Sequence, residues 1–317
     1  MINELQTYKR DLIAAHERIR QDIHNTPVMT SRLINEITGC DIYFKCENFQ
    51  RMGAFKMRGA LNAIHALSSE QQKRGVVTHS SGNFAQALSL AAKAIGIKAY
   101  IVMPSNAPKV KVAAVESYGG VVIKCTPTNE ARERTAQDIV QTKGATFIHP
   151  SNDRDVILGQ GTAAKELLEE IDNFDYLFAP VGGGGLIAGT IIAAQSFSKK
   201  TKVIGGEPFA VDDAYRSILS GKIEKNETLN TVADGLKTHL GDQNFPIIKE
   251  GIERIIRVEE AEIISAMRLI WERMKIIIEP SCAVPLAALI KEKNQFKGMK
   301  VGIILSGGNV DLDNLPF

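Results

Sequence analysis

Short apolar runs that are rich in β-branched residues recur along this chain, and they limit its fold more than any other feature. The runs extend from DIYFKCE near residue 41 to KVGIILSGG near residue 300, and stretches with helical periodicity lie between them. Runs that are apolar throughout are typical of strands covered on both faces. Alternating strands and helices predict an α/β fold with mainly parallel sheets.

Two helical stretches illustrate the pattern. We expect one helix over residues 83–94, with Gly96 as its C-terminal stop. A later helix is predicted because four apolar residues fall on one stripe: Ile263, Met267, Ile270 and Met274.

No linker rich in Pro, Gly or Ser divides the chain, so domain limits rest on the order of the elements. Residues 73–148 hold a run of strands and helices of their own. We therefore predict a small mobile α/β domain at 73–148, inserted in a large domain formed by residues 1–72 and 149–317.

Composition argues against several classes of partner. The chain has 38 Lys and Arg against 36 Asp and Glu, and no basic cluster is interleaved with aromatic residues, which argues against nucleic acid. The N-terminal segment lacks the apolar core of a signal peptide and no apolar run reaches bilayer length, which argues against a membrane. A reducing, cytoplasmic location fits the wide separation of the four cysteines, Cys40, Cys46, Cys125 and Cys282.

The segment HSSGNF places Ser80, Ser81, Gly82 and Asn83 between a predicted strand and a predicted helix. Backbone amides at a helix start, with two hydroxyl groups beside them, form a site for a small anion such as a carboxylate. The alternative is a simple N-cap, since Ser and Asn are favoured capping residues.

The segment APVGGGGLIAG repeats this arrangement with four glycines before a helix predicted to begin at Leu186. Four residues without side chains can approach a phosphate closely and direct N–H groups at it, whereas a tight turn needs only one or two. The glycines are Gly182, Gly183, Gly184 and Gly185.

A dinucleotide site is the rival interpretation of this turn. Gly183, Gly185 and Ala188 satisfy the G-x-G-x-x-A pattern, and Glu207 stands at the end of the next strand, where an acid that binds ribose is expected. The location argues against it, because the pattern usually opens the first βαβ unit of a cofactor domain and several such units precede it here. It also assigns no role to Lys56.

Lys56 lies in the segment NFQRMGAFKMRGA, between Phe55 and Met57. Desolvation by apolar neighbours would lower the pKa of the amine and supply the neutral form that condenses with an aldehyde. Near the C-terminus, Ser306 ends a strand just before a turn, where ligands of open α/β sheets bind. A phosphate site, a carboxylate site and a partly buried amine together suggest an amino acid held on pyridoxal phosphate.

Six segments in order, AFKMRGA, SSGN, GGGGLIAG, ADGLKT, WERMKIIIEP and LSGGNVDL, make the sequence resemble the fold-type II pyridoxal-phosphate enzymes. It is most similar to the branch that holds serine racemases, L-threo-3-hydroxyaspartate dehydratases and serine/threonine dehydratases. This resemblance implies a fold like that of the tryptophan synthase β subunit, with two open, twisted, mainly parallel sheets flanked by helices. It also implies a homodimer.

The resemblance implies a role for each candidate residue. Lys56 would bind the cofactor covalently and, once released by the substrate, remove the α-proton. Phe55 and Gly235 would cover the two faces of the cofactor ring, Asn83 would bind its 3-hydroxyl oxygen, and Ser306 would meet its pyridine nitrogen. Gly182 to Gly185 would bind the phosphate, and the substrate carboxylate would lie on Ser80, Ser81 and Gly82.

The expected reaction follows from Ser306. A hydroxyl group does not hold the pyridine nitrogen protonated as a carboxylate does, so loss of the β-hydroxyl group is favoured. We expect a dehydratase, or ammonia-lyase, that converts 3-hydroxyaspartate, serine or threonine to a 2-oxo acid and ammonia. The resemblance implies that Ser81 would be the second proton carrier, as the matching serine is in the racemases. Serine racemase activity is therefore expected beside elimination, and a dedicated serine racemase is the alternative.

The resemblance also implies a divalent cation. The carboxylates of Glu207 and Asp213 and the carbonyl of Val211 match the family's site for Mg²⁺, Ca²⁺ or Mn²⁺. The alternative is helix capping by Asp212 or Asp213. Such a metal would lie away from the reacting carbon.

Substrate choice rests on weaker signals. Arg132 could bind a second carboxylate and so favour 3-hydroxyaspartate, although a solvated helix charge is the commoner explanation of such an arginine. Phe84 follows Asn83 where the family commonly has histidine. Two other functions remain open: an NAD-dependent oxidoreductase, and a non-catalytic amino-acid or nucleotide sensor.

Overall fold

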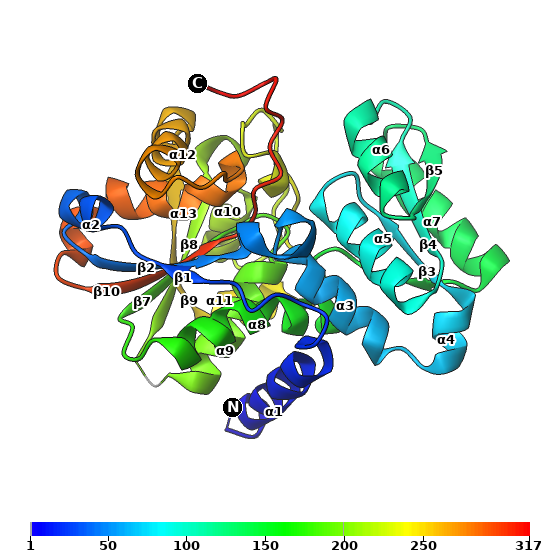
Figure 1. Ribbon diagram of the computed structural model, residues 1–317, viewed down its shortest axis with the longest axis horizontal. Coiled ribbons are helices and arrows are strands. Elements are labelled where there is room, and N and C mark those ends of the chain that lie inside the picture. Colours follow the sequence, from blue (N-terminus) through cyan, green and yellow to red (C-terminus); the bar gives the residue numbers. More distant parts are fainter. Residues whose placement is uncertain (1, 199) are drawn as a thin grey trace.

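The computed structural model describes residues 2–198 and 200–317, and it contains two separate sheets (Figure 1). The larger sheet has the strand order β1-β2-β10-β7-β8-β9, and all its neighbours are parallel except β1 and β2. Its strands are β1 (Val28–Met29), β2 (Asp41–Cys46), β7 (Tyr176–Pro180), β8 (Lys202–Pro208), β9 (Ile252–Val258) and β10 (Lys300–Leu305).

The smaller sheet has the order β5-β4-β3-β6 and is parallel throughout. Its strands are β3 (Val76–His79), β4 (Ala99–Pro104), β5 (Val121–Cys125) and β6 (Thr146–Phe147). All four lie within the range 73–148 predicted for the inserted domain; the domain limits themselves stay a prediction. The α/β class with two mainly parallel sheets is confirmed.

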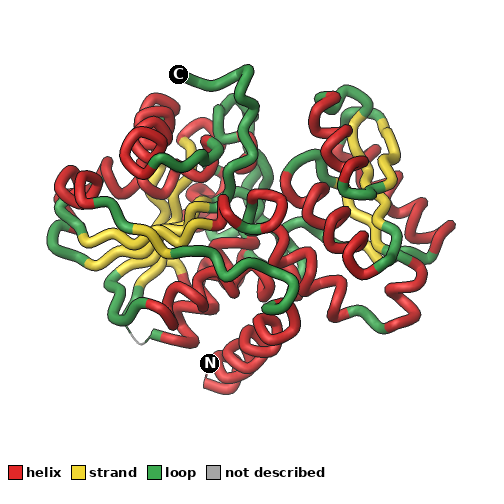
Figure 2. The backbone as a smooth tube through the Cα atoms, viewed as in Figure 1, coloured by secondary structure: helices red, strands yellow, loops and turns green. Residues whose placement is uncertain are grey.

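Helices cover both faces of the larger sheet (Figure 2). One face packs against α2 (Arg32–Thr38), α12 (Glu260–Met274), α13 (Pro280–Lys291) and α14 (Lys293–Phe296). The other packs against α1 (Ile2–Ile19), α8 (Arg154–Glu170), α9 (Gly185–Phe197), α10 (Asp213–Ser220) and α11 (Phe245–Gly251). Short 3₁₀ turns connect these elements at η1 (Glu47–Phe49), η2 (Arg51–Gly53), η3 (Phe209–Val211) and η4 (Asp234–Leu236).

The smaller sheet packs on one face against α5 (Asn83–Ile95) and α6 (Lys109–Ser117), and on the other against α7 (Asn129–Lys143). The helix α3 (Lys56–Ala66) contacts both α5 and α8, so it lies between the two sheets (Figure 1), and α4 (Ser69–Arg74) leads from it to β3. No helix in the described part of the chain is both long and apolar enough to cross a membrane.

The two helices predicted in detail are confirmed. The helix α5 ends at Ile95, one residue beyond the predicted end, and Gly96 follows with φ +78°. The apolar stripe of α12 is buried. One boundary differs slightly, because α9 begins at Gly185 and not at Leu186.

Candidate active site

Lys56 is the first residue of α3, and four contacts fix the position of this residue and its amine. The backbone N–H of Phe55 donates to the carbonyl of Ser306 at 3.0 Å, which ties the start of α3 to the end of β10. The Lys56 amine donates to the carbonyl of Pro150 at 2.7 Å. Its Nζ also lies 5.0 Å from the ring centre of Phe55 and 5.7 Å from that of Phe84.

These surroundings change the acidity of the amine. Burial lowers the pKa of Lys56 to about 7, and the negative charge of Glu279 opposes this change only in part. A large fraction of the amine is therefore neutral near pH 7, as its apolar sequence neighbours predict. Phe84, which stands where the family commonly has histidine, supplies one of these apolar surfaces.

The four glycines form the turn between β7 and α9. Gly184 has φ +84°, a conformation that favours glycine. A Cβ atom at Gly183 would lie 2.5 Å from the hydroxyl oxygen of Ser151 and 2.9 Å from that of Thr238. The turn therefore needs bare backbone, and two hydroxyl groups lie beside it. Sequence reasoning missed both, although Thr238 stands in the segment ADGLKT.

The second turn lies at the start of α5, where Gly82 precedes the first helical residue. A Cβ atom at Gly82 would have no neighbour within 4 Å, so the space beside it is open. Asn83 connects this turn to the larger sheet, because its Nδ2 donates to both carboxylate oxygens of Glu279 at 3.0 Å. Its Oδ1 accepts a hydrogen bond from Asn309 at 3.0 Å.

Glu279 is a residue that sequence reasoning missed, although it belongs to the segment WERMKIIIEP. Burial raises its pKa to about 7, while the hydrogen bond from Asn83 acts in the opposite direction. A Cβ atom at Gly235 would lie 3.9 Å from Glu279 Oε1, and the Gly235 N–H donates to Ser281 Oγ at 2.9 Å. The structure thus brings Asn83 and Gly235 next to one buried carboxyl group whose charge acts on Lys56. Phe55 and Ser306 are joined to each other by their backbone hydrogen bond.

An ion pair next to this group joins the two sheets. Lys111 Nζ on α6 lies 2.8 Å from Asp234 Oδ2 on η4, the residue before Gly235. Since α6 belongs to the smaller sheet and η4 to the larger, this contact and those of Asn83 hold the two parts together around Lys56.

Two histidines that sequence reasoning missed lie between Lys56 and Arg132. Burial, and next the positive charge of Arg132, lower the pKa of His79 at the end of β3. Its ring centre is 5.6 Å from that of His149. Burial, then His79 and Lys56, lower the pKa of His149 to about 4. Arg132 itself also donates a hydrogen bond to Asn129 within its own helix.

Four charged side chains, Arg58, Lys45, Glu47 and Glu166, form a buried group that we call the Arg58 cluster. The guanidinium of Arg58 is fully buried and donates to both carboxylate oxygens of Glu47, both of Glu166, and the Thr162 hydroxyl. Lys45 Nζ lies 2.7 Å from Glu166 Oε2. The cluster ties α3 to η1 and α8 and so fixes the helix that begins with Lys56.

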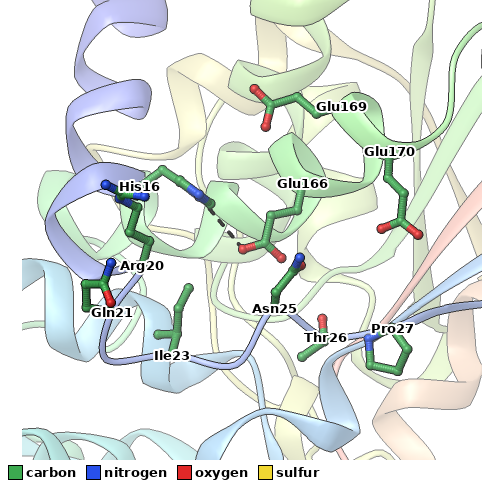
Figure 3. A pocket seen from close by; sticks show the side chains of 10 residues that line it. All are labelled: His16, Arg20, Gln21, Ile23, Asn25, Thr26, Pro27, Glu166, Glu169 and Glu170. Atoms are coloured by element: carbon green, nitrogen blue, oxygen red, sulfur yellow. Dashed lines mark ion pairs between the residues drawn. The ribbon is translucent and has the colours of Figure 1, made fainter.

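A cavity of about 650 Å³ is lined in part by Glu166, one carboxylate of the Arg58 cluster. On one side the cavity is lined by the end of α1 and the segment that follows it, and on the other side by the end of α8 (Figure 3). Glu166 forms part of the wall, and its Oε1 lies 3.8 Å from His16 Nδ1. None of the predicted site residues lines it. This cavity is therefore separate from the group around Lys56.

The predicted cation ligands Glu207 and Asp213 are both buried. Glu207 accepts hydrogen bonds from the N–H groups of Ala214 at 2.9 Å and Tyr215 at 2.8 Å. Asp213 Oδ1 accepts one from Asn226 at 2.6 Å, whereas its Oδ2 has no partner among the residues that the structure describes. Val211 ends η3 and lies between Glu207 and Asp213 in the sequence.

Neither carboxylate of this pair forms an ion pair within residues 2–198 and 200–317. Burial, and next the charge of Asp213, raise the pKa of Glu207. Burial raises the pKa of Asp213 to about 7. The described chain has no cluster of three or more His, Cys, Asp or Glu side chains suited to a metal, so a cation here would rest on two carboxylates, a carbonyl and water.

With this geometry established, comparison with known proteins places the chain. The family model described as "Pyridoxal-phosphate dependent enzyme" matches residues 19–307, and the chain belongs to this family. The dinucleotide interpretation loses its support accordingly. Glu207, its proposed ribose ligand, is buried and accepts two backbone N–H groups of α10.

Three known proteins show to which members of the family the chain is similar. A serine racemase from Dictyostelium discoideum is 52% identical over 96% of both chains, and its crystal structure matches with a TM-score of 0.92. A beta-hydroxyaspartate dehydratase from Paracoccus denitrificans is 48% identical over 99% of both chains. The structure of the processed form of threonine deaminase isoform 2 from Solanum lycopersicum matches with a TM-score of 0.93 at 32% identity, over 98% of this chain and 86% of that chain. The fold-type II resemblance is confirmed.

Proposed function

We propose that this protein is a pyridoxal-phosphate-dependent ammonia-lyase that converts a 3-hydroxy amino acid to a 2-oxo acid and ammonia, with serine racemase activity at the same site. The observation that carries the proposal is the Lys56 amine. Its pKa is lowered to about 7, and it lies at the meeting point of two sheets whose turns fit a phosphate and a carboxylate.

The residues present fit the cofactor. At Gly183 the hydroxyl groups of Ser151 and Thr238 leave no room for a side chain, so the turn offers backbone N–H groups and hydroxyl donors to a phosphate. Bound there, the cofactor would supply an aldehyde for Lys56 and a ring that accepts negative charge from the substrate's α-carbon. Gly235 and Phe55 would cover the ring, Asn83 would meet its 3-hydroxyl oxygen, and Ser306 would contact its nitrogen.

The chain's own groups would then handle the protons. The Lys56 amine, neutral for much of the time near pH 7, would accept the α-proton on one side of the substrate. The backbone of Gly82 and the hydroxyl groups of Ser80 and Ser81 would hold the substrate carboxylate. Ser81 on the opposite side would return a proton to give the other enantiomer. Ser81→Ala should therefore remove racemisation and retain elimination.

A substrate with a second carboxylate is supported by the charges at the edge of the site. Arg132 lies close enough to His79 to lower its pKa, and His79 comes just before Ser80. A cation next to the carboxylate turn favours 3-hydroxyaspartate over serine or threonine. Arg132→Leu should thus weaken the use of 3-hydroxyaspartate more than the use of serine.

A divalent cation, Mg²⁺ or else Ca²⁺ or Mn²⁺, would suit Glu207, the Val211 carbonyl and Asp213. The unpaired Asp213 Oδ2 and the raised pKa values of the two carboxylic acids are the observations in favour. A cation would remove the repulsion between the two carboxylates and hold the start of α10 against β8. We expect it to stabilise the fold and to take no part in proton transfer.

A homodimer is the assembly we expect. Phe49 and Ile277 are 44% and 49% exposed, and the hydrogen bond from Asn48 to the Ile277 carbonyl brings their segments together. Exposed apolar side chains on two neighbouring segments are suited to a protein contact. Sedimentation of the purified protein and of Ile277→Lys would test this. The four cysteines are all free thiols, which suits the cytoplasmic location expected from the sequence.

The test of the proposed function begins with the visible absorbance of the purified protein, which would report bound pyridoxal phosphate. Reduction with borohydride followed by mass spectrometry of peptides should find the cofactor on Lys56. Oxo acid and enantiomer are then measured together for L-serine, D-serine, L-threonine and the 3-hydroxyaspartate isomers. Lys56→Ala should lose all activity, while Lys200→Ala, a change on the surface, should keep it. Cofactor on Lys56 without turnover of any substrate would instead favour the sensor.

A further inference from the structure

Gln160 on α8 is a fully buried polar residue that the proposed function does not use. Its Nε2 donates to the carbonyl of Pro150 at 3.3 Å. The same carbonyl accepts the hydrogen bond from the Lys56 amine at 2.7 Å. One backbone oxygen therefore connects the buried amide with the reactive lysine.

The orientation of this amide follows from its neighbours. If the nitrogen and oxygen of the side chain were exchanged, Oε1 would face the carbonyl oxygen of Pro150 and the two acceptors would repel. With Nε2 directed at Pro150, Oε1 has no hydrogen-bond partner in the part of the chain that the structure describes. A buried polar atom left unpaired costs about 1–3 kcal/mol, so filling space in the core does not account for a glutamine here.

Gln160 also contacts the two segments that would hold the cofactor. A Cβ atom at Gly59, one turn after Lys56 on α3, would lie 3.0 Å from Gln160 Cγ. A Cβ atom at Gly185, the first residue of α9, would lie 2.5 Å from Gln160 Oε1. Glycine at both positions lets the Gln160 side chain fit between the helix of the lysine and the glycine turn.

We propose that Gln160 is a positioning residue of the cofactor site. Its Nε2 donates to the Pro150 carbonyl and so keeps that oxygen within hydrogen-bonding distance of the Lys56 amine. The rest of the side chain fills the space between α3 and the glycine turn and sets the distance between them. The amine is thereby kept where an aldehyde anchored by its phosphate on that turn would meet it. The unpaired Oε1, directed at the start of α9, remains available to accept a hydrogen bond when the site is filled. This inference rests on the proposed use of pyridoxal phosphate.

Two substitutions test the proposal. Gln160→Leu removes both polar atoms, and Gln160→Glu keeps the length of the side chain but replaces the Nε2 donor with an oxygen. The control is Thr190→Val in α9, which removes a buried hydroxyl whose acceptor is the carbonyl of Leu186 within the same helix. The cofactor is removed from each protein, and pyridoxal phosphate is added back.

Three quantities are measured: the rate at which the Lys56 complex forms by absorbance, the dissociation constant of pyridoxal phosphate, and the thermal unfolding midpoint of the cofactor-free protein. We expect both Gln160 variants to form the complex about ten- to a hundredfold more slowly, the size of effect caused by a misplaced reacting group. The cofactor-free unfolding midpoint of Gln160→Leu should fall no further than that of Thr190→Val.

Two results would overturn the proposal. The first is a rate and an affinity in both Gln160 variants equal to those of the wild type. The second is an equal loss in Thr190→Val, which would mean that any buried polar group in this core has the same effect. Failure of the proposed function would look different, because the wild-type protein itself would then form no complex with pyridoxal phosphate at Lys56.

Discussion

Two groups of buried charged side chains in this molecule differ in their balance of positive and negative charge. The Arg58 cluster contains two cations, Arg58 and Lys45, and two carboxylates, and all five N–H groups of the guanidinium have acceptors. The pair of Glu207 and Asp213 has two carboxylates, no ion pair in the described chain and one oxygen without a partner. Burial of charge alone therefore does not mark a ligand site; the missing opposite charge does.

The largest expected effect follows from breaking the balanced group. Arg58→Leu would leave Glu47 and Glu166 buried without their main partner, so we expect a loss of about 3–5 kcal/mol in the free energy of unfolding. The control is Arg268→Leu, which breaks an exposed pair with Glu272 and should cost about 0–1 kcal/mol. Urea denaturation of the three proteins measures the difference, and equal losses in the two variants would show that the Arg58 cluster contributes nothing special.

The unbalanced group should make stability depend on pH. In the folded protein the pKa of Asp213 is about 7, above the ordinary 3.8, so between these values the folded chain keeps a proton that the unfolded chain has released. Stability is then present at low pH and is lost as the pH rises through about 7, by about 1.4 kcal/mol for each unit of pKa difference.

Asp213→Asn removes this titration and serves as the reference. With a chelator present, urea denaturation at pH 5 and pH 8 should show a steeper fall with pH for the wild type than for the variant. Parallel behaviour of the two proteins would mean that Asp213 is ionised in the folded state without a cation.

Adding a divalent cation, the opposite charge that Glu207 and Asp213 lack, should restore the stability that is lost at high pH. At a concentration of Mg²⁺ or Ca²⁺ about a hundred times the dissociation constant, we expect a stabilisation of about 2.7 kcal/mol at pH 8. The shift in unfolding midpoint should be smaller at pH 6, where protons compete for the carboxylates, and absent in Asp213→Asn. A shift of the same size in that variant would place the cation elsewhere.

Lys56 is a third buried charged group, a single cation whose burial the charge of Glu279 offsets only in part. Of the effects predicted here, we expect that of its pKa to be the smallest. Because its pKa is about 7, the rate at which the cofactor-free protein binds pyridoxal phosphate covalently should rise about tenfold between pH 6 and pH 8 and then level off. Stopped-flow absorbance measures this rate. A rate that still rises steadily at pH 10 would indicate an ordinary, solvated lysine.

The comparison also shows what the sequence could predict. Strand β10 and the start of α9 were recognisable because apolar runs and glycine turns are local signals, and the gathering of Phe55, Lys56 and Ser306 follows from the parallel order of the strands. Strand β9 was missed because charged residues interrupt its apolar positions at the edge of the sheet.

Partners that are remote in the sequence could not be predicted. Lys56 and Pro150 are 94 residues apart, and Arg58 and Glu166 are 108 apart. The neighbours of Glu279 and His149 in the sequence do not show which groups surround them, because their burial is created by elements from other parts of the chain. The candidate residues were readable from motifs, whereas the groups that adjust their acidity needed the fold.

The ion pair between Lys111 and Asp234 has a consequence for the medium in which the protein works. Its side chains are 37% and 51% exposed, so dissolved salt weakens their attraction. The hydrogen bond between Asn83 and Asn309 involves no charge and does not weaken in this way. A high salt concentration therefore weakens the ion pair between the two sheets but not the Asn83–Asn309 hydrogen bond. The smaller sheet and its helices, with Ser81, should move away from Lys56 more readily in concentrated salt.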